Sequence, residues 1–577
     1  MTGISNRVLT RARSAVPIAV AVAALTLLSA CAGVPTSGPV QRGESVVEER
    51  GPIFPVGSAG PNTGDSPEAI VRGFLRAQAT GFTDDFQFAV ARQFLGDSAR
   101  NKWDPLKGAL VYASSSSPDF QLTGADQVRV GIVRAGTLQP GGQFDEDSGA
   151  SQSIEYVLQK DAAGQWRITN PDDGLVVSKA DFDELFVRTT IYFPSSDGNY
   201  LVPDVRWFAN RSVPTQVVRA VLGGPSAFLH DSARKVTADG VKLSRDAVTV
   251  TDGIAQVDLS AEETAAAPED RALLKVQLGA VFQQLPKIQG VRINVGGVEL
   301  SAPDPPQLVV DPQPAQILWY LADQHLVQLQ LQGNPPTPVA APGVDLSTVA
   351  EPSDPAIGYG VGGPIFLLSQ TQNLMYVPAD GTAPRQVLAG GGRLAPPSVD
   401  RFGWAWTAEK QSSGLVHAVS QDGTGRELHA DWLDRRSVQS LRVSRDGARL
   451  VIISTSPVGG VEVDVVGVQR QSGAPQKLSD PLRIGATVTG AVTVAWVDEA
   501  SVAVLGRTAG SPDQGVYIVP IGGPTRLVRS RPDATALATG GGDRALYVST
   551  ADGQLYLSGS TSGSPLATGV TYPTLQG

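Results

Sequence analysis

The thiol of Cys31 is the group in this chain whose surroundings most clearly predict covalent chemistry. Cys31 is the only cysteine, and it directly follows Leu28, Ser29 and Ala30. Three arginines and an apolar run precede these small residues, which is the order of a secretory signal with its charged start, apolar core and cleavage site. The apolar run is too short to span a bilayer with ease. The sequence therefore predicts a signal peptide over residues 1–30 and export of everything that follows.

This arrangement resembles the lipobox of bacterial lipoproteins, in which a small residue precedes the cysteine and a leucine lies three positions before it. The resemblance implies that Cys31 takes a diacylglycerol, becomes the mature N-terminus and carries acyl chains such as palmitate. Two chains give a stable anchor, because each buried methylene contributes about 0.8 kcal/mol. An incidental cysteine is the alternative, but it leaves the charged and apolar segments unexplained. We expect a lipid-anchored protein on the extracytoplasmic face of the cell membrane.

No other group of side chains has the spacing of a catalytic or metal site. The four histidines, His230, His325, His417 and His429, include no pair at the spacing of a zinc-binding helix. Ser226 lacks the last glycine of a nucleophile elbow. We expect His417 inside a strand and His429 just after one, both in ordinary surface or core roles. The sequence predicts a protein that is not an enzyme, with no catalytic, cofactor-binding or metal residues and no cofactor.

The acidic run Asp145-Glu146-Asp147 is the remaining candidate for a cation site. It lacks the alternate-position acids and the turn glycine of a calcium loop, so we expect a solvated turn. The glycine runs at residues 390–392 and 540–542 precede no predicted helix that could bind phosphate. We interpret both runs as turns between strands.

Composition indicates several domains rich in β structure. The chain has 577 residues, which is far more than one hydrophobic core accommodates, and only 18% of them are charged. Many glycines and prolines separate short apolar runs, as in sheets with frequent turns. The formal net charge of -10 argues against a nucleic-acid partner and against a protein that lies flat on anionic lipid. With its one thiol used by lipid, the chain forms no disulfide.

A tether and then an α+β domain are expected before residue 188. Residues 31–64 are rich in Gly, Pro and Ser, and as a flexible tether they would span on the order of 30 Å. From 65 to 187, Ser66 and Pro67 predict a helix start, and a second helical stretch is expected over 86–95. Strands are then expected at residues 109–113, 128–133, 154–158 and 166–168. Helices followed by a sheet that they cover give a layout similar to the cone-shaped NTF2-like fold.

Residues 188–303 carry a more specific pattern, which follows a short connecting helix over 178–186. The strand Ile191–Phe193 comes first, and the next helix is stopped by Gly223-Gly224-Pro225. A strand at Val257–Ser260 and a long amphipathic helix follow. This order resembles the α+β GerMN module of sporulation and germination proteins. An unrelated α+β domain with the same order of elements is the alternative.

Residues 304–577 repeat one pattern six times, at intervals of about 40 to 50 residues, which is the range of propeller blades. Each unit has an apolar strand, a turn with Gly or Asp-Gly and an apolar return. The units begin at Val309, Ile357, Ser398, Val443, Ala495 and Ala538. The pattern predicts an all-β propeller of about six blades. We expect Tyr572–Leu575 to take the innermost strand position and to pair beside Leu308–Val310, which would join the chain ends.

A lipobox, an NTF2-like α+β domain, a GerMN domain and a propeller, in that order, resemble the LpqB-type lipoproteins of actinobacteria. The resemblance implies an envelope lipoprotein that binds the ectodomain of a sensor histidine kinase of the MtrB type. It would thereby modulate the MtrA–MtrB two-component system and affect cell-wall homeostasis and division. Two other classes stay open. One is a receptor that holds a small envelope ligand in the propeller or the N-terminal domain, and the other is a propeller hydrolase, which the lack of a catalytic constellation disfavours.

Overall fold

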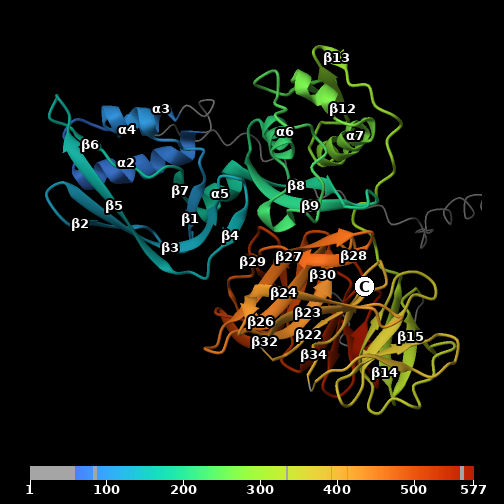
Figure 1. Ribbon diagram of the computed structural model, residues 1–577. Helices are drawn as coiled ribbons and strands as arrows, with labels where there is room; N and C mark the ends of the chain where they lie inside the picture. The colour runs from blue at the N-terminus through green and yellow to red at the C-terminus, as the bar shows by residue number, and fades with distance from the viewer. Residues whose placement is uncertain (1–58, 82–87, 333–335, 392, 412, 559–563) are drawn as a thin grey trace, which may run out of the picture. The chain divides into compact units, whose positions relative to one another are not determined.

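The computed structural model describes residues 59–81, 88–332, 336–391, 393–411, 413–558 and 564–577 (Figure 1). Along the chain, a mixed group of helices and strands is followed by a second mixed group and then by strands alone. The three groups are called the N-terminal domain, the GerMN domain and the propeller below. This is the multidomain order of α+β, α+β and all-β that the sequence predicts.

The N-terminal domain packs helix α2 (Pro67–Thr80) against a sheet. The α2 helix begins where the hydroxyl of Ser66 accepts a hydrogen bond from the Ala69 N–H, with Pro67 in the first turn. Its buried face carries Ile70, Val71, Phe74 and Leu75. The second predicted helical stretch is shorter than expected in the described residues, where α3 (Ala89–Arg92) is a single turn; α4 (Asp97–Lys102) follows.

The sheet of this domain has the strand order β6-β5-β3-β1-β7, and β2 and β4 also pair with β3. Its strands are β1 (Ala109–Tyr112), β2 (Asp119–Leu122), β3 (Gln127–Leu138), β4 (Phe144–Glu146), β5 (Ser151–Lys160), β6 (Trp166–Ile168) and β7 (Leu175–Ser178). The strands β1 and β7 run parallel, and the other pairs are antiparallel. The connecting helix α5 (Lys179–Leu185), capped by Ser178, leads out of the domain.

The GerMN domain combines a hairpin with a small sheet that two helices accompany. Its elements are β8 (Phe186–Pro194), β9 (Leu201–Ala209), α6 (Val213–Gly223), β10 (Thr249–Thr251), β11 (Ile254–Leu259), α7 (Pro268–Phe282), β12 (Gly290–Val295) and β13 (Val298–Glu299). The strands β8 and β9 pair antiparallel, and β11 runs parallel to β12 with α7 between them in the chain. The α6 helix ends because Gly224 takes a φ of 91°, which glycine tolerates, and Pro225 follows.

The propeller has six sheets among the described residues, as the repeat predicts. The first sheet is β16 (Thr337–Ala340), β15 (His325–Gln330), β14 (Ile317–Ala322) and β37 (Thr571–Thr574); the second is β17 (Ser353–Ile357), β18 (Ile365–Leu368), β19 (Leu374–Val377) and β20 (Arg385–Leu388). The third is β21 (Ser398–Val399), β22 (Ala405–Ala408), β23 (Ser413–Val419) and β24 (Gly425–Asp434); the fourth is β25 (Ser437–Val443), β26 (Arg449–Thr455), β27 (Val461–Gln471), β28 (Ala474–Leu478) and β29 (Leu482–Ile484). The fifth is β30 (Val488–Asp498), β31 (Ser501–Thr508), β32 (Ser511–Pro520) and β33 (Arg526–Ser530), and the sixth is β34 (Ala534–Thr539), β35 (Leu546–Thr550) and β36 (Leu555–Leu557).

The strand β37 closes the ring, but its pairing partner differs from the predicted one. It pairs with β14, opposite Trp319 and Leu321, and it contacts both β17 and β34, the first strands of the neighbouring sheets. The predicted partner, 308–310, lies instead on the edge of the GerMN hairpin, where the Leu201 N–H donates to the Val309 carbonyl. The expected innermost position of residues 572–574 is therefore correct, and the expected pairing with 308–310 is wrong.

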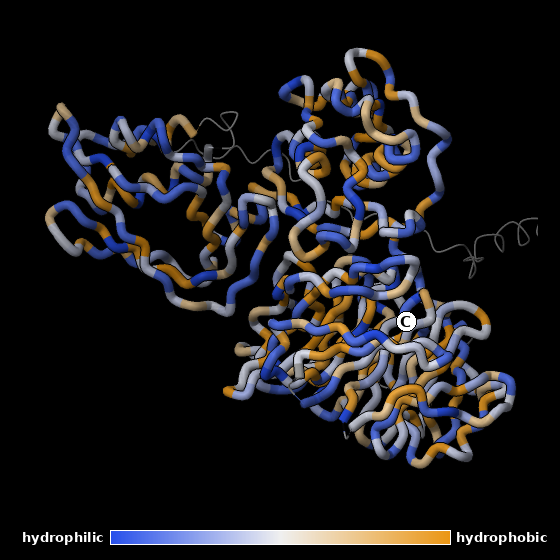
Figure 2. The backbone as a smooth tube through the Cα atoms, viewed as in Figure 1, coloured by the Kyte–Doolittle hydropathy of each residue, from blue (hydrophilic) through white to orange (hydrophobic). Residues whose placement is uncertain are grey.

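One hydrophobic core runs without interruption from the GerMN domain into the propeller. It includes Ile191 and Leu274 from the GerMN domain together with Val451 and Val504 from the propeller, all of them buried. In Figure 2 the apolar residues of the propeller follow its strands, while the connecting loops are largely hydrophilic. Because they share a core, the GerMN domain and the propeller form one packed body rather than two domains on a linker.

Candidate functional site

The residues with the clearest predicted chemistry lie outside the described part of the chain. Leu28, Ser29, Ala30 and Cys31 all precede residue 59, where the description begins. Lipid attachment at Cys31 therefore stays a prediction from the sequence.

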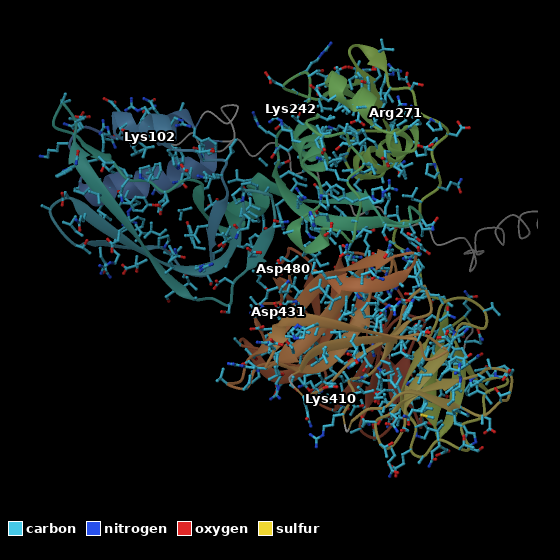
Figure 3. The ribbon with its side chains drawn as sticks, in the orientation of Figure 1. Lys102, Lys242, Arg271, Lys410, Asp431 and Asp480 are labelled. Atoms are coloured by element: carbon cyan, nitrogen blue, oxygen red, sulfur yellow. The ribbon has the colours of Figure 1, made fainter. Side chains whose placement is uncertain are left out.

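Two histidines of the propeller, His417 and His429, lie near carboxylates. His417 lies within β23, as expected, and its Nε2 is 3.7 Å from Glu409. His429 lies inside β24 rather than just after a strand, with its ring nitrogens 3.0 Å from Asp431 (Figure 3) and 3.1 Å from Asp434. Within the described ranges, no group of three or more His, Cys, Asp or Glu is arranged to hold a metal ion.

The acidic run 145–147 is not the solvated turn that the sequence predicts. The carboxylate of Glu146 accepts hydrogen bonds from the N–H and the hydroxyl of Thr525 in the propeller, at 2.7 and 2.8 Å. Burial raises the pKa of Glu146 above its ordinary value, although the bonds from Thr525 act in the opposite direction. Asp147 lies 3.2 Å from a guanidinium nitrogen of Arg134. The local sequence could not reveal this, because Thr525 lies 379 residues further along.

A cavity of about 370 Å³ lies inside the N-terminal domain, as the cone-like layout allows. Residues from α2, β1, β3, β5 and β7 line it, so it lies between the helix and the sheet and is partly open to solvent. Phe74, Leu138 and Ile154 supply apolar wall, while Gln78 and Tyr156 supply polar groups. The cavity is within the size range of small-molecule sites.

The two polar side chains of this cavity were not singled out from the sequence. Gln78 follows Phe74 by four positions, so it continues the buried face of α2 at a place where an apolar residue is expected. Tyr156 occupies a buried position on β5. The one signal in the sequence was the amide of Gln78 at an apolar position of α2. A buried amide needs hydrogen-bond partners, so its position could have indicated a polar site.

A second recess, of about 450 Å³, lies where the N-terminal domain meets the GerMN domain. The chain around Leu106 and the loop 138–142 form one side, and Trp207, Phe208 and the α6 helix form the other. Leu106 is 53% exposed although it is apolar. The recess thus offers apolar surface together with the exposed side chain of Arg219.

The centre of the propeller, in contrast, is filled by the chain itself. The remaining space there is about 40 Å³, and Tyr359, Arg442 and Arg445 are among its lining residues. The Gly577 N–H donates to the Ile357 carbonyl at 3.0 Å, and the Arg445 guanidinium donates to the Trp496 carbonyl at 2.8 Å. Little room is left for a ligand at this position.

The GerMN domain contacts the turns at one end of the propeller. The Tyr192 hydroxyl donates to the Glu499 carboxylate at 2.6 Å. Arg401 lies 2.8 Å from Asp197 and stacks on Tyr200, with its guanidinium carbon 4.1 Å from the ring centre. Arg401 and Glu499 lie in the turns that join the first and second strands of their blades. The GerMN domain therefore covers part of the end of the propeller at which a ligand channel or an active site was considered.

Comparison with known families matches most of the chain between residues 60 and 565. A family described as "Lipoprotein LpqB, N-terminal domain" matches residues 60–183, and one described as "Lipoprotein LpqB beta-propeller domain" matches residues 324–565. These two matches together cover more than half of the chain. The chain belongs to the LpqB family. A third family, described as "Sporulation and spore germination", matches residues 190–301, the part that resembles GerMN.

Curated LpqB proteins are similar over most of their length. The chain is 29% identical over 451 residues to lipoprotein LpqB of Bifidobacterium longum, which covers 75% of each chain. It is 25% identical over 555 residues to lipoprotein LpqB of Cutibacterium acnes, covering 90% of this chain and 91% of the relative. The first GerMN domain of the Bacillus subtilis sporulation protein GerM is 23% identical, covers 21% of this chain and 93% of that chain, and has a TM-score of 0.18.

LpqB membership and the GerMN and propeller architecture point to a non-catalytic envelope lipoprotein. None of the helices in the described ranges is both long enough and apolar enough to cross a bilayer.

Proposed function

We propose that this LpqB-type protein is a regulatory interaction protein of the cell envelope. A lipid on Cys31 anchors it to the membrane, and it binds the ectodomain of an MtrB-type sensor kinase. It thereby modulates MtrA–MtrB signalling, with effects on cell-wall homeostasis and division. The observation that carries the proposal is the core shared by the GerMN domain and the propeller, which presents the outer surfaces of both as one rigid unit. Binding of a partner to such a rigid surface costs little free energy for ordering the surface itself.

The anchor supplies the second physical argument. A lipid and a tether confine the folded domains to a thin layer above the membrane, so a sensor in that membrane meets them at a high effective concentration. A modest affinity is then sufficient. To shift signalling, the protein must bind the two states of the sensor with different affinity.

We assign the contact to the recess at Leu106, with an extracytoplasmic segment of the sensor as its occupant. Exposed apolar surface beside Trp207 and Phe208 suits an apolar anchor side chain. The exposed Arg219 on the same recess suits an acidic neighbour of that anchor. The expected occupant therefore has an apolar residue next to a carboxylate.

Leu106→Glu tests this assignment against a matched control. Leu106 and Leu122 lie in the same domain and are 53% and 56% exposed, so neither substitution should impair folding. In-cell crosslinking of the full-length lipoprotein should capture the sensor kinase with the wild type and with Leu122→Glu, and much less of it with Leu106→Glu. Phosphorylation of the response regulator should change only in the Leu106 variant. Equal capture by both variants would exclude the recess, and no capture by the wild type would exclude the sensor as partner.

Cys31→Ser tests the anchor separately. The variant should carry no lipid, should remain an uncleaved or mislocalised precursor, and should fail to restore signalling in cells that lack the protein. Labelled palmitate that still appears on the variant would contradict the assignment of Cys31.

A further inference from the structure

The cavity of the N-terminal domain contains polar groups that are oriented but unused. Gln78 is 1% exposed, and its Oε1 accepts a hydrogen bond from the Val176 N–H at 2.6 Å. This bond fixes which end of the amide is oxygen, because a backbone N–H only donates. The opposite end, Nε2, is a donor with no hydrogen-bond partner among the described residues. The cavity leaves this donor accessible to water or to a ligand.

Tyr156 presents a second group of the same kind. Its side chain is 3% exposed and packs against Phe74, with the ring centres 6.3 Å apart. Its hydroxyl also has no hydrogen-bond partner in the described ranges, although the residue lines the cavity. Burial raises the pKa of Tyr156 far above its ordinary value, so the phenol stays protonated and able to donate.

Arg134 adds a positive charge to the lining. Its Nη2 lies 3.2 Å from Asp147 and donates to the Thr137 hydroxyl at 3.3 Å. Its Nε is buried and has no hydrogen-bond partner among the described residues. The charge of Arg134 is paired with that of Asp147, while one of its N–H donors is left without an acceptor in the described chain.

The remaining wall is apolar and the mouth is charged. Phe74, Leu138 and Ile154 are buried and line the cavity. At the mouth Lys107 pairs with Asp173 at 2.9 Å, and both remain partly exposed. Asp172, an exposed carboxylate, also lines the cavity and lies next to this pair in the chain. The interior therefore combines apolar surface with two neutral donors and one paired cation, and the mouth has one acid more than it has bases.

We propose that this cavity binds a small amphipathic carboxylate. Its carboxylate accepts hydrogen bonds from Gln78 and Tyr156 and is attracted by Arg134, and its apolar body lies against Phe74, Leu138 and Ile154. Such sites combine mostly apolar walls with a few placed polar groups. The site needs no partner protein, and its polar groups differ from those of the proposed contact with a sensor kinase, although Leu138 lines both recesses.

Calorimetric titration of the full mature chain with decanoate tests the site, with decylamine as the matched cation. Decanoate should bind at one saturable site, and decylamine should not. Tyr156→Phe should weaken decanoate binding about fivefold, the usual net value of one hydrogen bond. Gln78→Glu retains an oxygen for the Val176 N–H but replaces the donor with an acceptor, so it should weaken binding at least about tenfold. Tyr112→Phe, in the same domain but outside the cavity, should bind as the wild type does.

Three results would overturn the proposal. The first is the absence of saturable decanoate binding at concentrations up to about 1 mM, the limit of a useful weak affinity. The second is decylamine binding as tight as that of decanoate. The third is wild-type affinity in both the Tyr156 and the Gln78 variants, which would place the bound acid elsewhere. The Tyr156 variant is expected to fold normally, because the hydroxyl that it lacks has no partner within the described ranges. Weaker binding by this variant would therefore not be due to misfolding.

Discussion

The cavity of the N-terminal domain and the centre of the propeller are both recesses between elements of one domain, yet they are built in opposite ways. The cavity retains about 370 Å³ and leaves the polar ends of Gln78 and Tyr156 without partners in the described chain. The propeller centre retains about 40 Å³, because the last residues of the chain occupy it. The contrast locates small-molecule binding in the N-terminal domain and gives the propeller a structural and surface role.

The buried pair of Asp400 and Arg470 in the propeller is one example of polar groups that are fully used. Asp400 accepts hydrogen bonds from the N–H groups of Phe402 and Trp404, the indole of Trp406 and the guanidinium of Arg470. Both members of the Asp400–Arg470 pair are almost fully buried. Buried charges that pair this completely stabilise a single arrangement, whereas unpaired groups are available to a ligand.

The largest effect is expected from removal of β37. A chain that stops after Val570 loses the strand next to β14 and so exposes a sheet edge in the first blade. We expect a loss of more than about 5 kcal/mol, which is comparable with the net stability of a whole domain. Calorimetric melting and size-exclusion chromatography would show a lost transition or aggregation.

A shorter truncation is the control for that experiment. A chain that stops after Leu575 keeps all of β37 and loses only Gln576 and Gly577, whose bonds to Gly360 and Ile357 fill the centre. It should melt well above the longer truncation. If both truncated chains melt like the full chain, the closure of the ring through β37 is not important for stability.

The buried ion pair should give the next largest effect. Asp400→Ala leaves Arg470 buried without its counter-charge, which costs about 3–5 kcal/mol. Arg526→Ala breaks an ion pair with Asp543 in which both side chains are about half exposed, and such pairs contribute at most about 1 kcal/mol. Urea unfolding of the two variants measures the difference. Equal losses would mean that the burial of Asp400 does not set its contribution.

Acid should weaken the contact that covers one end of the propeller. Burial acts to raise the pKa of Asp197, but hydrogen bonds from Arg401, Ser195 and Asn199 outweigh it and hold the pKa well below its ordinary value of 3.8. The ionised carboxylate therefore stabilises the fold at higher pH, and this contribution is lost as the pH falls below about 4. Melting temperatures between pH 7 and pH 2 should fall more steeply for the wild type than for Asp197→Asn. Parallel curves would contradict the role of Asp197.

The smallest effect is expected from two tyrosine hydroxyls, and their difference is informative. Tyr192→Phe removes the hydrogen bond to Glu499 and should cost about 1.5–3 kcal/mol, as is usual for bonds to charged groups. Tyr156→Phe removes a hydroxyl that has no partner in the described chain, so it should change stability by less than about 1 kcal/mol and should not reduce it. Chemical unfolding of both variants makes the comparison. A clear loss with Tyr156→Phe would show that this hydroxyl is structural.

Local patterns predicted the repeating parts of this molecule well. The six turn-centred units correspond to six sheets because each blade needs the same turn and the same alternation of apolar residues. The capping residue Ser66 and the proline after it predicted the start of α2 for a similar reason. In each case the forces that set the structure act between residues close in sequence.

The failed expectations all depend on contacts between distant residues. Glu146 was predicted to be solvated because its partner Thr525 is far away in the sequence. Residues 308–310 were predicted to pair with the last strand, but they pair with the GerMN hairpin instead. The cavity was foreseen only as a layout. Its polar groups come from different elements, α2 and β5, and only folding brings Gln78 and Tyr156 to one space.

The closing strand also affects how this protein can fold after the export that we propose. The Thr571 hydroxyl bonds to the Leu321 carbonyl 250 residues earlier in the chain. A chain that emerges N-terminus first must therefore hold the first blade incomplete until nearly all of the propeller has crossed the membrane. During that interval the inner edge of β14 is open to pairing with other strands, which is a known route to misassembly. We expect the secretion machinery or a periplasm-like chaperone to shield this edge, so that the time needed for translocation sets the lower limit on the time needed to fold.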